Sequence, residues 1–172
     1  HEAVAVLSSL KPVGNSEFQG NLGYALMTQG DLHQSEQVFR ELTAKDPENA
    51  EARNHLGMVL IRRGRYPEAM EELHRVVREY PKMVEAWNNL GAAYQKCLCM
   101  DEARSYFERA LQVDPYNADA HNNLGCVLRE CGEIEEAIEE LQLASTLEPQ
   151  NPAIHLNLAL SYQRASQLTK SI

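Results

Sequence analysis

The sequence lacks the features that mark several classes of protein. Its 172 residues include only four cysteines, which lie in one part of the chain, so we do not expect a disulfide-dense secreted fold. Glycine and proline number nine and seven, too few for a collagenous or disordered chain. Apolar runs such as Met58–Ile61 are far shorter than the roughly 20 residues of a membrane-spanning helix, so we expect no membrane insertion.

Positive charge is also scarce. Sixteen lysines and arginines oppose 25 aspartates and glutamates, a net charge of −9, which does not favour nucleic acid as a partner. The cysteines lack the C-x-x-C spacing of a zinc knuckle, and we expect free thiols in a reducing compartment, the cytoplasm; they are Cys97, Cys99, Cys126 and Cys131. The common catalytic motifs are missing, so we predict no enzyme, metal site or cofactor.

The sequence does contain residues that recur every 34 positions. One such ladder is glycine, at Gly23, Gly57, Gly91 and Gly125. A second is leucine, one residue earlier, and it extends to Leu158. A third is proline, at Pro47, Pro81, Pro115 and Pro149. Three ladders with one period indicate a repeat architecture, with units at 16–49, 50–83, 84–117 and 118–151 and a partial unit at 152–172.

Each unit carries two amphipathic helical patterns in succession. In unit 84–117 the first apolar face has the helical spacing i, i+3, i+4, i+7 and consists of Trp87, Leu90, Gly91 and Tyr94. The second face consists of Ala103, Phe107 and Ala110. The small residues Gly91 and Ala103 let the two helices approach closely. One helix pair cannot bury its apolar face alone, so the pairs are expected to stack into an all-α solenoid.

This unit resembles the tetratricopeptide repeat. Its pattern W-x2-L-G-x2-Y, then A-x3-F-x2-A, then P matches the family signature, and the resemblance covers nearly the whole chain. It implies a right-handed superhelical solenoid of antiparallel helix pairs. In later units His121 and His155 replace the signature tryptophan, and we expect these histidines to pack between helices.

The ends of the chain and one turn depart from the pattern. We expect residues 1–15 to form the second helix of a preceding partial repeat. The chain breaks off at Ile172, about where another second helix should begin, so we interpret 1–172 as a single stretch of a longer solenoid. Glycine follows the first helix in three units, but Leu98 stands at that position in the third. This predicts either a strained left-handed leucine or a turn of another kind.

The resemblance also implies that the first helices line a concave groove that binds extended peptides. On the face of the first helices opposite the signature residues, asparagine recurs at two adjacent positions of the repeat. The candidate peptide-binding residues are Asn21, Tyr24, Asn54, His55, Asn88, Asn89, Asn122, Asn123 and Asn157. An amide offers two donors and an acceptor, so this row could hold a peptide backbone without recognising its side chains. The alternative is that the asparagines brace neighbouring repeats.

A basic row lies near the ends of the same helices, and an acidic row lies at their starts. The basic row, which would form one edge of the groove, is Arg62, Lys96, Arg129 and Arg164. The acidic row is Glu17, Glu51, Glu85 and Asp119. Both rows complement the helix dipoles, and together they would orient a partner peptide.

The predicted function is therefore a non-catalytic scaffold that binds a protein or an extended peptide in its groove. The asparagine row also resembles that of the repeat domain of O-linked N-acetylglucosamine transferase and of importin-like solenoids. A substrate-recognition arm of a larger glycosyltransferase-like enzyme is thus one alternative. Self-assembly of the repeats into an array, through ends without capping helices, is another.

Overall fold

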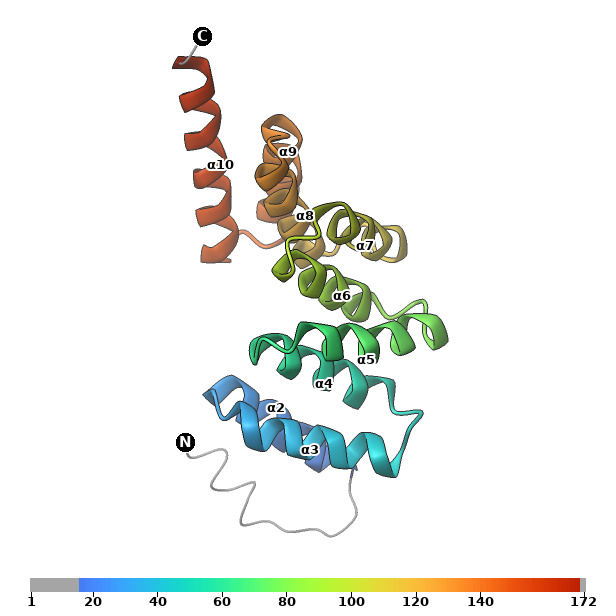
Figure 1. The fold of residues 1–172 in the computed structure, drawn as a ribbon. Helices are drawn as coiled ribbons and strands as arrows, with labels where there is room; N and C mark the ends of the chain where they lie inside the picture. Colours follow the sequence, from blue (N-terminus) through green and yellow to red (C-terminus); the bar gives the residue numbers. More distant parts are fainter. Residues whose placement is uncertain (1–15, 171–172) are drawn as a thin grey trace. The chain divides into compact units, whose positions relative to one another are not determined.

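The computed structural model describes residues 16–170, with side chains as far as residue 167. The helix expected over residues 1–15 lies outside this range. The described residues form nine α-helices and no strand (Figure 1). These helices are α2 (Ser16–Gln29), α3 (Leu32–Lys45), α4 (Ala50–Arg62), α5 (Tyr66–Glu79), α6 (Val84–Lys96), α7 (Met100–Val113), α8 (Ala118–Cys131), α9 (Ile134–Leu147) and α10 (Pro152–Lys170).

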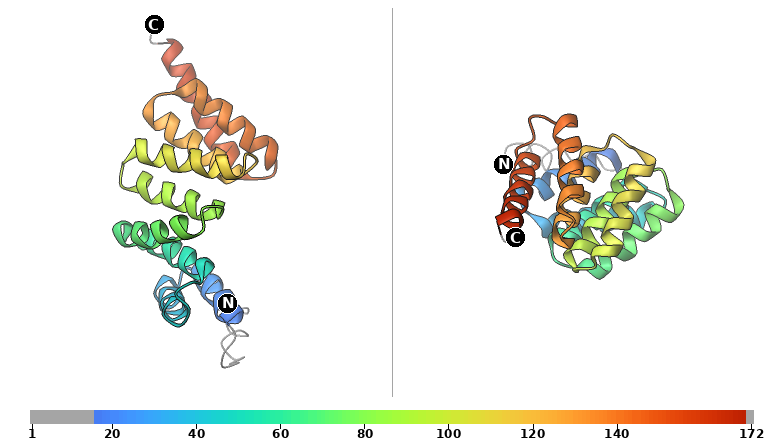
Figure 2. Two further views of the ribbon diagram at one scale, coloured as in Figure 1. Left: turned by 90° about the vertical axis from the view of Figure 1, so that its right-hand side faces the viewer. Right: turned by 90° about the horizontal axis from the view of Figure 1, so that it is seen from above.

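The chain divides into two compact units, one ending at Pro81 and the other beginning at Lys82. In the first unit α2 packs on α3 and α4 on α5, and α3 also packs on α4. In the second unit α6 packs on α7, α8 on α7 and α9, and α10 on α9. Figure 2 shows these pairs from two further directions. Each pair coincides with one 34-residue repeat, so the predicted all-α helix pairs are confirmed.

Within a pair, the signature glycine and the residue facing it set the distance between the helices. A Cβ atom added to Gly91 would lie 2.7 Å from Cε1 of Phe107, closer than real carbon atoms approach. Phe107 is completely buried, and the ring of Trp87 stacks on Tyr106 with 6.1 Å between centroids. The close approach predicted for α6 and α7 is therefore observed, and the ring of Phe107 occupies the space that a side chain at position 91 would need.

The turn after α6 contains a left-handed leucine, which is one of the two alternatives predicted from the sequence. Leu98 has a φ of +61°, whereas Gly132, which occupies the equivalent position after α8, has a φ of +90°. A left-handed backbone costs a residue with a Cβ roughly 1–2 kcal/mol. The Leu98 side chain is also 79% exposed, so it gains little burial that would offset this cost.

Replacing Leu98 with glycine is therefore expected to stabilise the second unit. Relief of strain outweighs the greater freedom of glycine in the unfolded chain, and the net gain should be about 0.5–1 kcal/mol. Urea unfolding followed by the fluorescence of Trp87, the one tryptophan of the chain, measures it. The control Gly132→Ala places a Cβ at the equivalent left-handed position and should lower stability. An unchanged urea midpoint for Leu98→Gly would show that the turn carries no strain.

The last described helix is longer than the earlier first helices. α10 runs without interruption over the 19 residues from Pro152 to Lys170, whereas the earlier first helices have 13 or 14 residues. Ser166 stands where Gly30, Gly64 and Gly132 follow earlier first helices. Serine has no preference for the left-handed conformation that ends those helices, so the helix continues.

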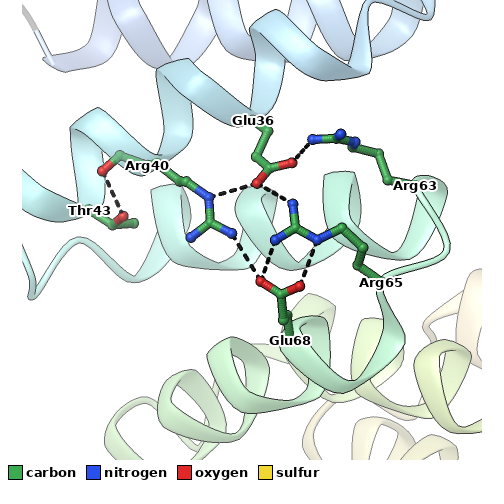
Figure 3. Close-up of polar contacts among 6 residues, drawn as sticks. All are labelled: Glu36, Arg40, Thr43, Arg63, Arg65 and Glu68. Atoms are coloured by element: carbon green, nitrogen blue, oxygen red, sulfur yellow. Dashed lines mark hydrogen bonds and ion pairs between the residues drawn. The ribbon is translucent and has the colours of Figure 1, made fainter.

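A network of charged side chains joins the two pairs of the first unit (Figure 3). The carboxylate of Glu36 on α3 is only 6% exposed, and it accepts hydrogen bonds from Arg40 Nε at 2.7 Å and from Arg65 Nη1 at 2.6 Å. Arg63 also donates to it. Glu68 on α5 accepts hydrogen bonds from Arg65 Nε at 2.6 Å and from Arg40 Nη2 at 3.2 Å. One buried carboxylate thus binds α3 to the turn between α4 and α5.

The second unit has the same contact with the charges exchanged. Sixty-eight residues after Glu36 and Arg65, two repeats later, stand Arg104 and Glu133, and Arg104 Nη1 lies 2.8 Å from Glu133 Oε2. Arg104 Nε also donates to Glu108 at 2.9 Å. The contact therefore occupies the same place in the repeat in both units, while the sign of each partner is reversed.

Candidate functional site

The asparagines of the second unit form a chain of hydrogen bonds from one first helix to the next. Asn157 Nδ2 on α10 donates to Asn122 Oδ1 on α8 at 2.9 Å. Asn122 Nδ2 donates to Asn123 Oδ1 at 3.4 Å, and Asn123 Nδ2 donates to Asn88 Oδ1 on α6 at 3.0 Å. The two bonds between helices join residues that are 35 positions apart, so the pair Asn157–Asn122 is equivalent to the pair Asn123–Asn88 one repeat earlier.

Each linked amide retains hydrogen-bonding capacity. The four side chains are partly exposed, and an amide nitrogen that makes one such bond keeps a second N–H. Asn89, on the same face of α6, is also partly exposed and has an interaction of its own. The bracing role that the sequence left open is therefore present, and binding of a peptide by the remaining N–H groups stays a prediction.

In the first unit the equivalent positions carry no amide pair. His55 stands 68 residues before Asn123, and Gly20 stands 68 residues before Asn88. A Cβ atom added to Gly20 would meet no atom of the described part of the chain within 4 Å. A pocket of about 480 Å³ opens here among α2, α3 and α4, and its lining includes Asn21, Tyr24 and His55. Asn54, the other predicted residue on α4, is buried, with 3% of its surface exposed.

Aromatic rings form one wall of this pocket. The ring of His55 stacks on Phe39 with 5.1 Å between centroids, and Tyr24 meets the same imidazole edge-on at 5.6 Å. Burial lowers the pKa of His55 below its usual value, and the charge of Glu51 opposes this only in part. The imidazole therefore stays neutral at pH 7. Glu17 and Glu51 also line the pocket, and none of the described residues that line it is a lysine or an arginine.

The predicted basic row divides into two kinds of residue. Arg62 Nη1 donates to the main-chain oxygen of Met27 in the last turn of α2 at 2.5 Å. Arg129 Nη1 donates to the main-chain oxygen of Asn157 in α10 at 3.1 Å. Both guanidinium groups thus join neighbouring first helices. Lys96 and Arg164 make no such contact with another described helix, and both side chains are exposed. Their role in binding a partner stays a prediction.

The residues that replace the signature tryptophan bridge a helix pair to the preceding turn. His121 Nδ1 lies 2.6 Å from Glu140 Oε2 on α9, and its Nε2 lies 3.0 Å from the main-chain oxygen of Pro115. Arg53, at the equivalent position of the first unit, bonds Glu72 at 2.5 Å and the oxygen of Pro47 at 2.6 Å. The packing role expected for His121 is confirmed. His155, which is exposed, contacts the turn through the oxygen of Pro149 at 2.8 Å.

The pocket at Gly20 is the feature that reasoning from the sequence missed. The signal was present in the alignment of the repeats, where the asparagine pair of the third and fourth units becomes Gly20 and His55 in the first and second. Sequence alone did not show that the gap stays open, because a neighbouring side chain could have filled it.

Among residues 16–170, no group of three or more histidine, cysteine, aspartate or glutamate side chains could hold a metal ion together. None of the helices in the same range combines the length and hydropathy needed to cross a membrane. The four cysteines are free, and Cys97 and Cys131 are exposed.

Family models for the tetratricopeptide repeat match residues 21–84, 84–117 and 106–139, and a model described as TPR repeat matches residues 125–166. Together they run from residue 21 to residue 166 without a gap. The chain belongs to the tetratricopeptide-repeat family. Comparison with curated proteins gives no significant match.

Solved structures agree with this assignment. A thermophilic tetratricopeptide-repeat protein of Thermus thermophilus is 23% identical with a TM-score of 0.83, covering 90% of this chain and 85% of its own. MamA of Desulfovibrio magneticus is 24% identical with a TM-score of 0.70, covering 88% and 86%. In the APC/C hetero-tetramer Cut9–Hcn1 the matched chain is 18% identical with a TM-score of 0.80, covering 92% of this chain and 32% of its own. These likenesses establish the superhelical tetratricopeptide-repeat fold class, and the family is one of protein-interaction scaffolds.

Proposed function

We propose that this tetratricopeptide-repeat chain is a non-catalytic scaffold that holds an extended segment of a partner protein along its first helices. The observation that carries the proposal is the hydrogen-bonded row of Asn88, Asn122, Asn123 and Asn157. An extended backbone presents N–H and C=O groups in alternation, and amide side chains match both kinds. The bonds within the row hold the amides in place, which lowers the entropy cost of binding.

The amide row is tested with short peptides selected from a displayed random library on the whole chain. In the double variant Asn123→Ala, Asn157→Ala, the selected peptides should bind about tenfold more weakly, because two backbone contacts at about 0.5–1.5 kcal/mol each are lost. N-methylation of single peptide bonds should weaken binding to the wild-type chain by a similar factor. Isothermal titration calorimetry measures both affinities.

A matched control replaces the exposed amides Gln37 and Gln150, which lie outside the row, with alanine. This double variant should bind the peptides as the wild type does. A single cooperative unfolding transition, followed by Trp87 fluorescence, confirms that the asparagine variant is folded. If that variant retained full affinity, the peptides would bind elsewhere and the amide row would be a brace alone.

A second copy of the chain is a further candidate partner. Three large apolar side chains of α10 are exposed: Leu156 by 61%, Leu160 by 42% and Tyr162 by 47%. Sedimentation velocity on the same samples separates the two proposals, since self-association depends on the concentration of the chain. The four free thiols support a reducing compartment, and we place the protein in the cytoplasm.

A further inference from the structure

The pocket of the first unit differs in chemistry from the amide row of the second. Its lining combines the carboxylates of Glu17 and Glu51 with the rings of Tyr24, Phe39 and His55. The amide of Asn21 stands beside them, and Asn21 is exposed. Phe39 is completely buried and stacks on His55, so the pocket presents negative charge together with the rings of Tyr24 and His55.

The pocket exists because the repeat pattern is broken at one position. Glycine in the interior of a helix is unfavourable relative to alanine, and Gly20 lies in the second turn of α2. An asparagine at the equivalent position of α6 reaches the next repeat through the bond from Asn123 to Asn88. Without that side chain at position 20, the space in front of His55 stays open.

This lining selects for positive charge. A cation is attracted to the face of an aromatic ring, and a carboxylate forms its strongest hydrogen bonds with charged donors. His55 adds no opposing charge, because burial lowers its pKa and keeps the ring neutral at pH 7. A volume of about 480 Å³ accommodates a long basic side chain with its aliphatic stem.

We propose that the pocket formed by Gly20, Tyr24, Phe39, His55, Glu17 and Glu51 binds the side chain of an arginine or a lysine of the partner peptide. This inference rests on the proposed function and names an anchor residue of the peptide. Arginine is the better ligand of the two, because its planar guanidinium stacks on rings and donates to two carboxylates at once.

The first test uses the peptides selected on the whole chain. They should carry a basic residue at one position, and replacing it with citrulline, the neutral analogue of arginine, should weaken binding to the wild type about tenfold. The variant Glu17→Gln, Glu51→Gln should lose a similar factor with the arginine peptide and should not distinguish arginine from citrulline. The control Glu41→Gln, Glu135→Gln removes the same charge from exposed positions on α3 and α9 and should behave as the wild type.

A second test needs no peptide. Nα-acetylarginine amide, titrated into the isotopically labelled chain, should shift the amide resonances of Gly20, Tyr24 and His55, whereas the citrulline compound should not. The lysine compound separates the two basic side chains, and we expect it to bind more weakly.

The outcomes separate this inference from the proposed function. Selected peptides that need the asparagine row but carry no basic anchor would overturn the pocket proposal and leave the scaffold intact. Failure of the whole chain to select any peptide would count against the scaffold, while arginine-specific shifts at Gly20 and His55 would still support the pocket. The absence of those shifts would overturn it.

Discussion

Replacing Phe107 with alanine is expected to lower the free energy of unfolding of the second unit by about 4 kcal/mol. The ring is completely buried, and it lies against Gly91, which has no side chain that could move into the cavity. Ala103 and Ala110, the neighbouring small residues of α7, cannot fill it either. Urea unfolding followed by Trp87 fluorescence measures the change, because Trp87 lies on α6 in the same unit.

The chain supplies its own control for this substitution. Leu73 and Leu141 occupy the position of Phe107 in the second and fourth repeats, and each faces a glycine. A Cβ atom added to that glycine would lie 2.6–2.7 Å from the leucine Cγ. Phe107→Leu should therefore cost only about 1.5 kcal/mol or less. Equal losses for the alanine and leucine variants would show that the pair depends on the aromatic ring itself and not on filled volume.

Replacing Glu36 with glutamine is expected to destabilise the first unit by about 2 kcal/mol. The carboxylate is 6% exposed, and loss of its charge leaves the guanidinium groups around it with a weaker acceptor. The arginines are 30–44% exposed, so water screens part of the effect and keeps it below the full cost of a broken buried pair. Amide hydrogen exchange of α3 and α4, analysed by mass spectrometry, measures the change in this unit, which lacks a tryptophan.

The same residue predicts a dependence on pH. Burial alone would raise the pKa of Glu36, but hydrogen bonds from Arg40 and Arg65 and their charges outweigh burial and lower the pKa below 4.5. A lowered pKa in the folded state means that the carboxylate stabilises the fold above the unfolded pKa of 4.5. This contribution is lost as the pH falls through the folded value.

Glu36→Gln should therefore show a smaller loss of protection below pH 4.5 than the wild type. Glu71→Gln is the matched control, because Glu71 lies on the second helix α5 and pairs with Arg75, yet is 65% exposed. It should change stability by less than about 0.5 kcal/mol and keep the acid sensitivity of the wild type. An identical pH profile for all three proteins would show that Glu36 does not contribute to acid unfolding.

The helix pairs could be predicted from sequence because their causes are local and periodic. Every 34 residues, glycine recurs at the position of Gly91 and a large apolar residue recurs at the position of Phe107. Each position has the same neighbours in every repeat. The strain at Leu98 could be anticipated as one of two possibilities, because the equivalent positions are glycines with positive φ. The length of α10 could not be predicted from the sequence, since Ser166 permits either a turn or a continued helix.

Contacts between repeats were harder to predict from the sequence. They depend on the way in which extended side chains from two helices meet. The sequence predicted an asparagine row, but the direction of its bonds, from Asn157 to Asn122 and from Asn123 to Asn88, required the packed helices. The exchanged charges of Glu36 and Arg104 likewise appear in the sequence as ordinary members of amphipathic helices. The burial of Glu36 and the ion-pair partners of both residues appear only once α3 and α7 are packed on their neighbours.

The sequence alone therefore determined the repeat, its all-α class and its membership of a scaffold family, because these depend on the spacing of small and apolar residues along the chain. The tertiary structure decided which deviations from the repeat matter. At Gly20 the missing side chain leaves a space that none of the residues 16–170 fills, and the rings and carboxylates around it form a pocket. Whether a gap in a pattern closes or stays open depends on the packing of all the neighbouring side chains, which no single ladder of residues records.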